Sequence, residues 1–280
     1  MARSLAQLLE APTTYVLGGP DRVPEPRLKT HITTDVAIIG AGYTGLAAAR
    51  LLGAGGRHVV VLEAGVIGAG ASGRNGGQMI PGFNLPQTEL QRLFGSETAT
   101  ALWQAVETTR HGLTERIRQT PGQCDLQTGI VYAAFNQAQL DDAAALADNL
   151  KHECGYQHLR LISQSEIRNS TSPRFIGGIE WSDAHHVNPY KLLLLALAQA
   201  QSAGCIIYEN TPALAVGGES GRYTLTTAQG CVTARDVVIA TAATFSPLRG
   251  LGPRHAPSHV PIATFVLATE PCDAERILPT

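Results

Sequence analysis

Three glycines spaced as G-x-G-x-x-G, namely Gly40, Gly42 and Gly45, separate an apolar run from an alanine-rich segment. Each glycine of this pattern has its own use when a pyrophosphate binds. The first permits a tight turn, the second lets the phosphates approach the backbone, and the third lets a helix pack closely on a strand. The start of that helix adds N–H groups and a partial positive charge, so the pattern favours a bound pyrophosphate.

A single acid, Glu63, follows the next apolar run. At the end of a second strand, its carboxylate would accept hydrogen bonds from both hydroxyls of an adenosine ribose and would repel a 2′-phosphate. The alternative is a glycine-rich turn with a surface glutamate. Because the glycines, the helix, the strand and the acid follow in register, we favour the binding of a dinucleotide that contains ADP.

These residues need a strand, a helix and a second strand to position them. Residues 34–40 ("TDVAIIG") form a compact apolar run typical of a buried parallel strand. Residues 43–56 carry alanine and leucine at helical spacing and end on glycines, and residues 58–65 ("HVVVLEAG") predict a second buried strand. Together they form one βαβ unit, which indicates an α/β fold with a Rossmann-type domain.

The second glycine loop, residues 68–77 ("GAGASGRNGG"), contains five glycines, one arginine and one asparagine. A loop after the second strand leaves the ligand-binding edge of such a sheet, and its N–H groups would form an anion-binding nest. Arg74 and Asn75 would add charge and amide contacts to the pyrophosphate or to a ring edge. The alternative is an ordinary surface loop. An NAD enzyme needs no second loop here, so FAD is the favoured dinucleotide and an NAD-dependent dehydrogenase is the alternative.

The composition excludes several classes of function. A net charge of −2 without a basic cluster gives no reason to expect nucleic acid as a partner. The five cysteines form no C-x-x-C pair, which argues against a disulfide framework and indicates a reducing compartment. No apolar run is long enough to span a bilayer and no secretory signal is recognisable, so we expect a soluble, cytoplasmic protein without a transmembrane segment.

Asp183, His185 and His186 ("SDAHHV") are the strongest metal-ligand candidates by residue type. A carboxylate and two adjacent histidines on an extended segment point to different faces, so we expect strand-edge or capping roles and no metal site. Trp103 and Trp181 are interpreted as packing residues rather than as substrate platforms.

The rest of the chain predicts further helices and strands. A helix capped by Ser96 is expected over residues 96–119, and Asn136 and Gly155 would bound another. Asn188 followed by Pro189 predicts the start of a third. A short helix is expected at residues 163–169, and strands or bent strands at 126–135, 175–187, 205–211, 213–219, 222–230, 231–241 and 259–271.

The run from Asp35 to Gln78, with "GASGRNGGQ" as its most specific part, resembles the FAD-dependent D-amino-acid oxidase superfamily. Within it, the run is most similar to the branch of glycine oxidase, sarcosine oxidase and gamma-glutamylputrescine oxidoreductase. "HVNPYKLLLLALA" and "VTARDVVIATAA" resemble later parts of the family. The resemblance implies a Rossmann-type FAD-binding domain interleaved with an α+β substrate domain that is incomplete here. We therefore expect an N-terminal arm (1–32), a discontinuous FAD-binding domain (33–92 and 186–250) and a partial substrate domain (93–185 and 251–280).

The resemblance also implies which residues contact FAD. At the pyrophosphate it places Gly40, Gly42, Tyr43, Thr44 and Gly45, with simple packing as the alternative for Tyr43 and Thr44. Glu63 and Ala64 would lie at the ribose, Ala213 at the adenine, and Ala240 and Thr241 beside the ADP. Along the pyrophosphate and the flavin ring it places Ser72, Arg74, Asn75, Gly76, Gly77 and Gln78. Relatives often carry an asparagine where this chain has Ala242 and Ala243.

By the same resemblance, the expected chemistry is FAD-dependent oxidation of the C–N bond of a small amine or amino acid to an imine, by hydride transfer to flavin. The family continues beyond residue 280 with the segment that completes the substrate domain and supplies most substrate-binding residues, so no catalytic residue is named. We expect a truncated chain that lacks its C-terminal half or meets a partner chain. The alternative is an inactive remnant that binds nucleotide weakly.

Overall fold

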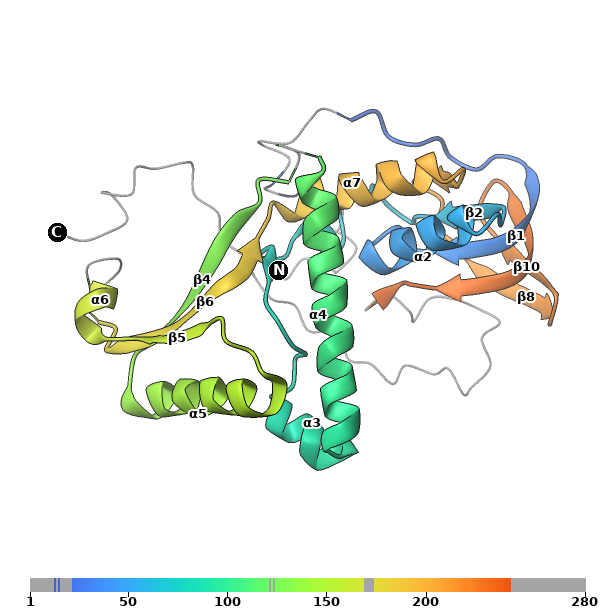
Figure 1. Ribbon diagram of the computed structural model, residues 1–280. Coiled ribbons are helices and arrows are strands. Elements are labelled where there is room, and N and C mark those ends of the chain that lie inside the picture. The colour runs from blue at the N-terminus through green and yellow to red at the C-terminus, as the bar shows by residue number, and fades with distance from the viewer. Residues whose placement is uncertain are drawn as a thin grey trace, which may run out of the picture. The chain divides into compact units, whose positions relative to one another are not determined.

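The computed structural model of the chain describes residues 13, 15, 22–120, 122, 124–168 and 174–242 (Figure 1). These residues fall into two compact units. The first takes its described residues from Met1–Asn75 and Pro189–Val266, and the second takes them from Gly76–Asn188. Among the helices in this part of the chain, none combines the length and the apolar character needed to cross a membrane.

The first unit is built on a six-stranded sheet in the order β7-β2-β1-β10-β9-β8. β7, β2, β1 and β10 run parallel, and β9 and β8 extend the sheet as an antiparallel hairpin. The strands are β1 His31–Ile39, β2 Val59–Leu62, β7 Ile206–Tyr208, β8 Ala215–Glu219, β9 Arg222–Thr226 and β10 Cys231–Ile239; the helices are α2 Tyr43–Ala54, α7 Pro189–Ser202 and the 3-10 turn η2 Ala71–Gly73. The predicted α/β fold with a parallel sheet is confirmed.

Both faces of this sheet are covered, which is why its central strands are continuously apolar. On one face, Ile38 of β1 belongs to a cluster with Leu46 of α2 and Leu193 of α7, the two helices that lie side by side in Figure 1. On the other face, Ile39 belongs to a second cluster with Leu225 of β9. The βαβ unit read from the sequence is therefore the centre of this unit's core.

The second unit has a sheet in the order β3-β6-β4, with β5 also paired to β6. Trp103, Trp181 and Tyr156 lie in its core, and the rings of Trp103 and Tyr156 meet edge to face with centroids 5.4 Å apart. Both tryptophans are buried, which agrees with the predicted packing role. The elements are β3 Gln78–Met79, β4 Gln127–Ala134, β5 Leu159–Ile162, β6 Gly177–His186, α3 Gln87–Phe94, α4 Ser96–Arg118, α5 Gln137–Cys154 and α6 Gln164–Arg168.

The capping residues in the sequence predicted several helix ends correctly and one incorrectly. The Asn136 side chain accepts the N–H of Gln139 at 3.0 Å at the start of α5, and Gly155 ends that helix with φ of 66°. The expectation that Ser96 caps α4 is wrong, because Ser96 is already helical and Gly95, with φ of 80°, is the cap residue. Glycine adopts this left-handed backbone without strain, which lets the chain turn from α3 into α4.

The expected bent strand is β4, whose pairing register shifts between Thr128 and Ile130, where Gly129 has φ of 95°. The sequence did not predict α3 or β5. The strand expected at residues 259–271 lies outside the described residues. The predicted domains differ from the two compact units mainly in residues 76–92, which belong to the second unit, and the division by function stays a prediction.

Candidate cofactor-binding site

The carboxyl ends of β1, β2 and β10 lie at one edge of the first unit's sheet. β1 lies between β2 and β10, so the strand order reverses there, and open α/β sheets bind ligands at such a point. The Gly40 N–H donates to the carbonyl of Leu62, and the Ala240 N–H donates to that of Ile39, each at 2.8 Å. These bonds join the three strand ends directly beside the glycine turn.

Each glycine of the G-x-G-x-x-G pattern occupies a place that a side chain would obstruct. Gly40 has φ of 103°, and a Cβ there would lie 2.5 Å from the carbonyl oxygen of Ala240. A Cβ at Gly45 would overlap the carbonyl oxygen of Gly40, and one at Gly42 would lie 3.0 Å from Ser72 Oγ. Gly40 and Gly45 therefore need bare backbone, whereas a Cβ at Gly42 would press only on the Ser72 hydroxyl. A closely approaching pyrophosphate also requires an open turn of this kind.

The start of α2 is suited to an anion. Its first N–H groups have no carbonyl partner within the helix, and its first turn carries no acidic side chain to oppose the helix dipole. The Tyr43 N–H donates to Ser72 Oγ at 3.1 Å, and the Tyr43 hydroxyl donates to the carbonyl of Pro189 at 2.7 Å. The Tyr43 side chain thus holds α2 against the start of α7, while Thr44 is exposed.

Glu63 is held in place from several sides. Its Oε2 accepts the Ala41 N–H at 2.8 Å, and its Oε1 accepts the Gly65 N–H at 3.0 Å. Its own N–H donates to the carbonyl of Tyr208, and its carbonyl accepts the N–H of Thr211, each at 2.8 Å. The carboxylate therefore lies beside the glycine turn with lone pairs left for further donors, and the neighbouring Ala64 is exposed.

The second glycine loop has a defined conformation within the first unit. Arg74 Nε donates to the carbonyl of Ala69 at 2.7 Å, and Asn75 Nδ2 donates to that of Ser72 at 3.0 Å. Gly68 is buried with φ of 95°, and a Cβ there would lie 2.6 Å from the ring of Tyr190. Gly68 thus serves close packing, which an ordinary surface loop would not need, whereas a Cβ at Gly70 would have no atom within 4 Å.

The remaining predicted residues fall into two groups. Ala240 and Thr241 follow β10 at the same sheet edge, and Ala213 packs partly buried beside the cluster that contains Leu62. Gly76, Gly77 and Gln78 belong to the second unit: Gln78 pairs with His186 between β3 and β6, and the Gly77 carbonyl accepts the Val187 N–H at 2.9 Å. A contact between these three and a flavin ring stays a prediction.

The donors gathered in the first unit fit the ADP part of a dinucleotide. Backbone N–H groups at a helix start suit a pyrophosphate, and a carboxylate at the end of β2 suits the ribose hydroxyls. A parallel sheet with these features at its switch point defines a dinucleotide-binding protein of the Rossmann type.

Comparison with known proteins gives the family. Residues 35–280 match the family described as FAD dependent oxidoreductase (DAO), and the chain belongs to that family, whose cofactor is FAD. The chain is 32% identical over 239 residues to "Probable oxidoreductase OrdL" of Haemophilus influenzae, which covers 85% of this chain and 56% of that protein. It is 30% identical over 257 residues to "Gamma-glutamylputrescine oxidoreductase" of Escherichia coli, covering 91% of this chain and 59% of that protein.

Solved structures agree on the fold. Glycine oxidase from Geobacillus kaustophilus matches with a TM-score of 0.59 at 24% identity, over 75% of this chain and 55% of that one. L-amino acid deaminase from Proteus vulgaris matches with a TM-score of 0.61 at 21% identity, over 80% of this chain and 50% of that one. The chain thus spans a little over half the length of the curated relatives it matches.

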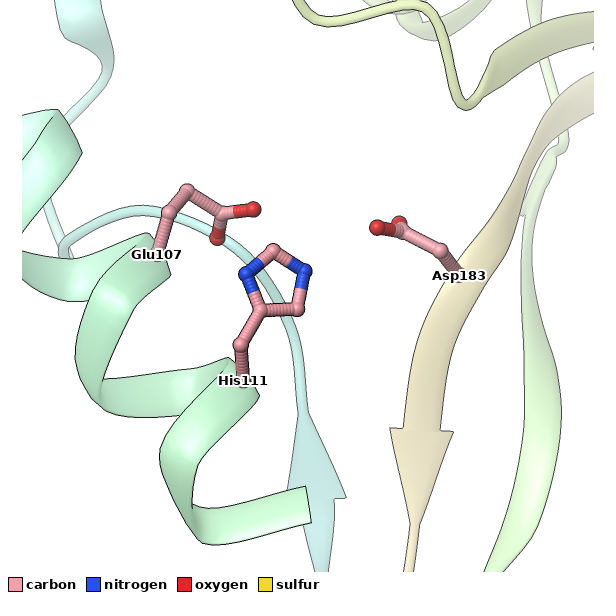
Figure 2. A group of neighbouring side chains, drawn as sticks. All are labelled: Glu107, His111 and Asp183. Carbon is pink, nitrogen blue, oxygen red and sulfur yellow. The ribbon is translucent and has the colours of Figure 1, made fainter. Parts of the chain in front are cut away.

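In the second unit, Asp183 belongs to a cluster whose other members the sequence did not single out. Glu107 and His111 lie one turn apart on α4, and Asp183 extends toward them from β6 (Figure 2); one potential ligand atom from each lies within 4.8 Å of the others. Arg110 Nη2, however, bonds Glu107 at 2.7 Å and Asp183 at 2.8 Å. A guanidinium thus already bonds both carboxylates, and a metal ion would have to displace it. Glu107, Arg110 and His111 at helical spacing were the signal in the sequence.

The cluster shifts the pKa values of its members. Charge-assisted bonds to Glu107 and Asp183 outweigh burial and raise the pKa of Arg110. Hydrogen bonds from Tyr156 and Arg110 outweigh burial and hold the pKa of Asp183 below its usual value. Burial and the charge of Arg110 lower the pKa of His185, whose Nδ1 lies 3.0 Å from Thr128 Oγ1. His185 is buried and His186 exposed, and neither belongs to the group that could hold a metal.

An apolar cavity of about 490 Å³ lies within the second unit, lined by Phe83, Trp103, Tyr132, Leu146 and Trp181 among others. None of the residues predicted to contact FAD lines it.

Proposed function

We propose that this chain forms the FAD-binding part of an oxidoreductase that oxidises the C–N bond of a small amine or amino acid to an imine. The observation that carries the proposal is the Glu63 carboxylate beside the glycine turn, in a chain of the FAD dependent oxidoreductase family. The amine class is supported by the relatives, which include a gamma-glutamylputrescine oxidoreductase and a glycine oxidase.

The residues of the first unit have distinct roles in this proposal. The N–H groups at the start of α2, beside Gly42 and Thr44, hold the pyrophosphate, and Glu63 accepts the ribose hydroxyls. Ala64 and Ala213 border the adenosine, and Ala240 and Thr241 border the ADP. Arg74 adds positive charge from the second glycine loop. FAD, when bound, supplies a ring that accepts a hydride from the carbon next to the nitrogen.

The second unit contributes the residues that follow the glycine loop and part of the substrate domain. Gly76, Gly77 and Gln78 border the flavin ring in this proposal, and no catalytic side chain is assigned. The substrate-binding groups then come from a further part of a longer protein or from a partner chain. A cytoplasmic location belongs to the same proposal and is supported by Cys154, Cys205 and Cys231, whose thiols are free.

The test is an absorption spectrum of the purified 280-residue chain after addition of FAD and gel filtration, followed by anaerobic addition of primary and secondary amines. We expect a retained oxidised-flavin spectrum that amines do not bleach, because the substrate-binding groups of the proposal lie outside these 280 residues. Bleaching by an amine would show that this chain alone binds and oxidises the substrate, and would contradict that placement of the substrate-binding groups. A colourless protein would contradict FAD binding by this chain.

A further inference from the structure

The N-terminal arm bonds the far end of the second glycine loop directly and the start of the loop through Glu209. We infer that Thr13, Tyr15 and Arg22 of the arm, together with Glu209 after β7, are positioning residues that hold this loop in the conformation required for the cofactor. The inference rests on the proposed function, since it assigns the loop to FAD.

At the start of the loop, a buried carboxylate joins three segments. Glu209 is completely buried, and it accepts the N–H of Ile67, the residue directly before the loop. The same carboxylate accepts the Glu25 N–H and a bond from Arg22 Nη2, each at 2.5 Å. A buried charge is tolerated only when paired and hydrogen-bonded, so Glu209 requires both the arm and Ile67 in place.

At the far end of the loop, two hydroxyl groups of the arm bond its backbone. Thr13 Oγ1 donates to the carbonyl of Gly73 at 2.7 Å, and the Tyr15 hydroxyl donates to that of Asn75 at 3.0 Å. Thr13 is buried at 6% exposure, although isolated threonines on an irregular segment are usually exposed. In each of these two bonds the partners are 60 residues apart in the sequence, and both bonds fix the same stretch of the loop.

The fixed loop in turn contacts the proposed pyrophosphate site. Ser72, the residue next to Gly73, accepts the Tyr43 N–H at the start of α2. A loop with five glycines has an unusually large conformational entropy when free, and restraining it before binding lowers the cost of ordering it around a ligand. The arm therefore pre-organises Ser72 and Arg74 for the cofactor.

The experiment compares the whole chain with the double variant Thr13→Val, Tyr15→Phe, which removes only the two hydroxyls. The matched control is Thr109→Val, which removes a hydroxyl that donates to the carbonyl of Ala105 at 2.8 Å on α4 of the second unit. Hydrogen exchange of the Gly73 and Arg74 amides, which donate within the loop, is measured without FAD. The FAD dissociation constant is measured on the same three proteins by flavin fluorescence.

In the double variant, but not in the control, we expect amide exchange in the loop and the FAD dissociation constant each to rise by about tenfold, as two lost hydrogen bonds imply. Unchanged loop exchange in the double variant would overturn the inference, whatever the affinity for FAD. Faster loop exchange in a chain whose parent does not bind FAD would support the positioning role and contradict the proposed function.

Discussion

The Glu63 carboxylate accepts the backbone N–H of Ala41 at 2.8 Å, so the acid at the end of β2 is bonded to the glycine turn at the end of β1. Its other oxygen accepts the Gly65 N–H. One carboxylate thus fixes the two loops that the proposal assigns to the pyrophosphate and the ribose. Its position does not depend on side-chain flexibility, because both oxygens are already held by backbone donors.

Replacement of this acid tests the relationship directly. We expect Glu63→Gln to raise the FAD dissociation constant by about tenfold to a hundredfold. The amide oxygen can accept only one of the N–H groups of Ala41 and Gly65, and the amide NH₂ then faces the other N–H group. A fluorescence titration with FAD measures this dissociation constant. Glu219→Gln, at the end of β8, is the control with an unchanged constant, and an equal effect of both changes would refute a specific role for Glu63.

The third glycine of the turn is expected to tolerate no side chain. A Cβ at position 45 would overlap the Gly40 carbonyl oxygen, so Gly45→Ala should push α2 away from β1 and cost about 1–3 kcal/mol of folding free energy as well as FAD binding. Gly217→Ala is the control, since no atom lies within 4 Å of a Cβ there. Thermal unfolding followed by circular dichroism gives the stability of both variants. Equal unfolding midpoints for Gly45→Ala and Gly217→Ala would contradict the expectation.

The sequence predicted the first unit well because its signals are local. The signals are the spacing of the glycines, the alanine-rich helix and the acid after β2. All of them lie within one short stretch of the chain, and backbone geometry alone explains why each residue type stands at its position. For residues 1–32 the sequence predicts only an N-terminal arm, because the burial of Thr13 and the bond of Arg22 to Glu209 depend on residues far away in the chain. Likewise, α4 places Arg110 against Asp183 of β6 only after the second unit has folded, which no spacing rule anticipates.

The second unit should become less stable in acid. Some acids have a lower pKa in the folded chain than in the unfolded chain. Such an acid stabilises the folded state at pH values above its unfolded pKa, and this stabilisation is lost as the pH falls through its folded pKa. Asp183 is such a group, so the free energy of unfolding should fall as the pH drops below the ordinary value of 3.8. At pH 7, Asp183→Asn should cost about 2 kcal/mol, and the difference should shrink in acid.

Both tryptophans of the chain, Trp103 and Trp181, lie in the second unit's core, so their fluorescence in urea reports on that unit. The Asp183 charge raises the pKa of His185 against the burial that lowers it, so the difference between the parent chain and Asp183→Asn also contains a contribution from His185, which acts at higher pH than that of Asp183. A difference that stays constant from pH 7 to pH 3 would contradict the assignment to Asp183.

The same fluorescence tests whether the Glu107, His111 and Asp183 group holds a metal. Because Arg110 already bonds both carboxylates, neither EDTA nor added Zn²⁺ should move the thermal midpoint of the parent chain. Arg110→Met removes the competing charge, so in this variant Zn²⁺ should raise the midpoint. A midpoint of the parent chain that falls with EDTA would show a metal site that Arg110 does not block.

Removal of Glu209 should destabilise the first unit, because Arg22 loses its ion pair at 2.5 Å and keeps only the longer one to Glu25 at 3.6 Å. We expect Glu209→Ala to cost about 3 kcal/mol, near the lower end for a broken buried ion pair because Arg22 is partly exposed. The Ile67 N–H loses its acceptor in the same change. The double change Arg22→Met, Glu209→Leu should recover most of the loss, since apolar packing replaces an ion pair without a stranded charge. Urea unfolding followed by circular dichroism gives the free energy of unfolding of the parent chain and of both variants. A double variant as unstable as Glu209→Ala would show that the bonds from the backbone of Ile67 and Glu25 to Glu209, rather than the charge pair, carry the stability.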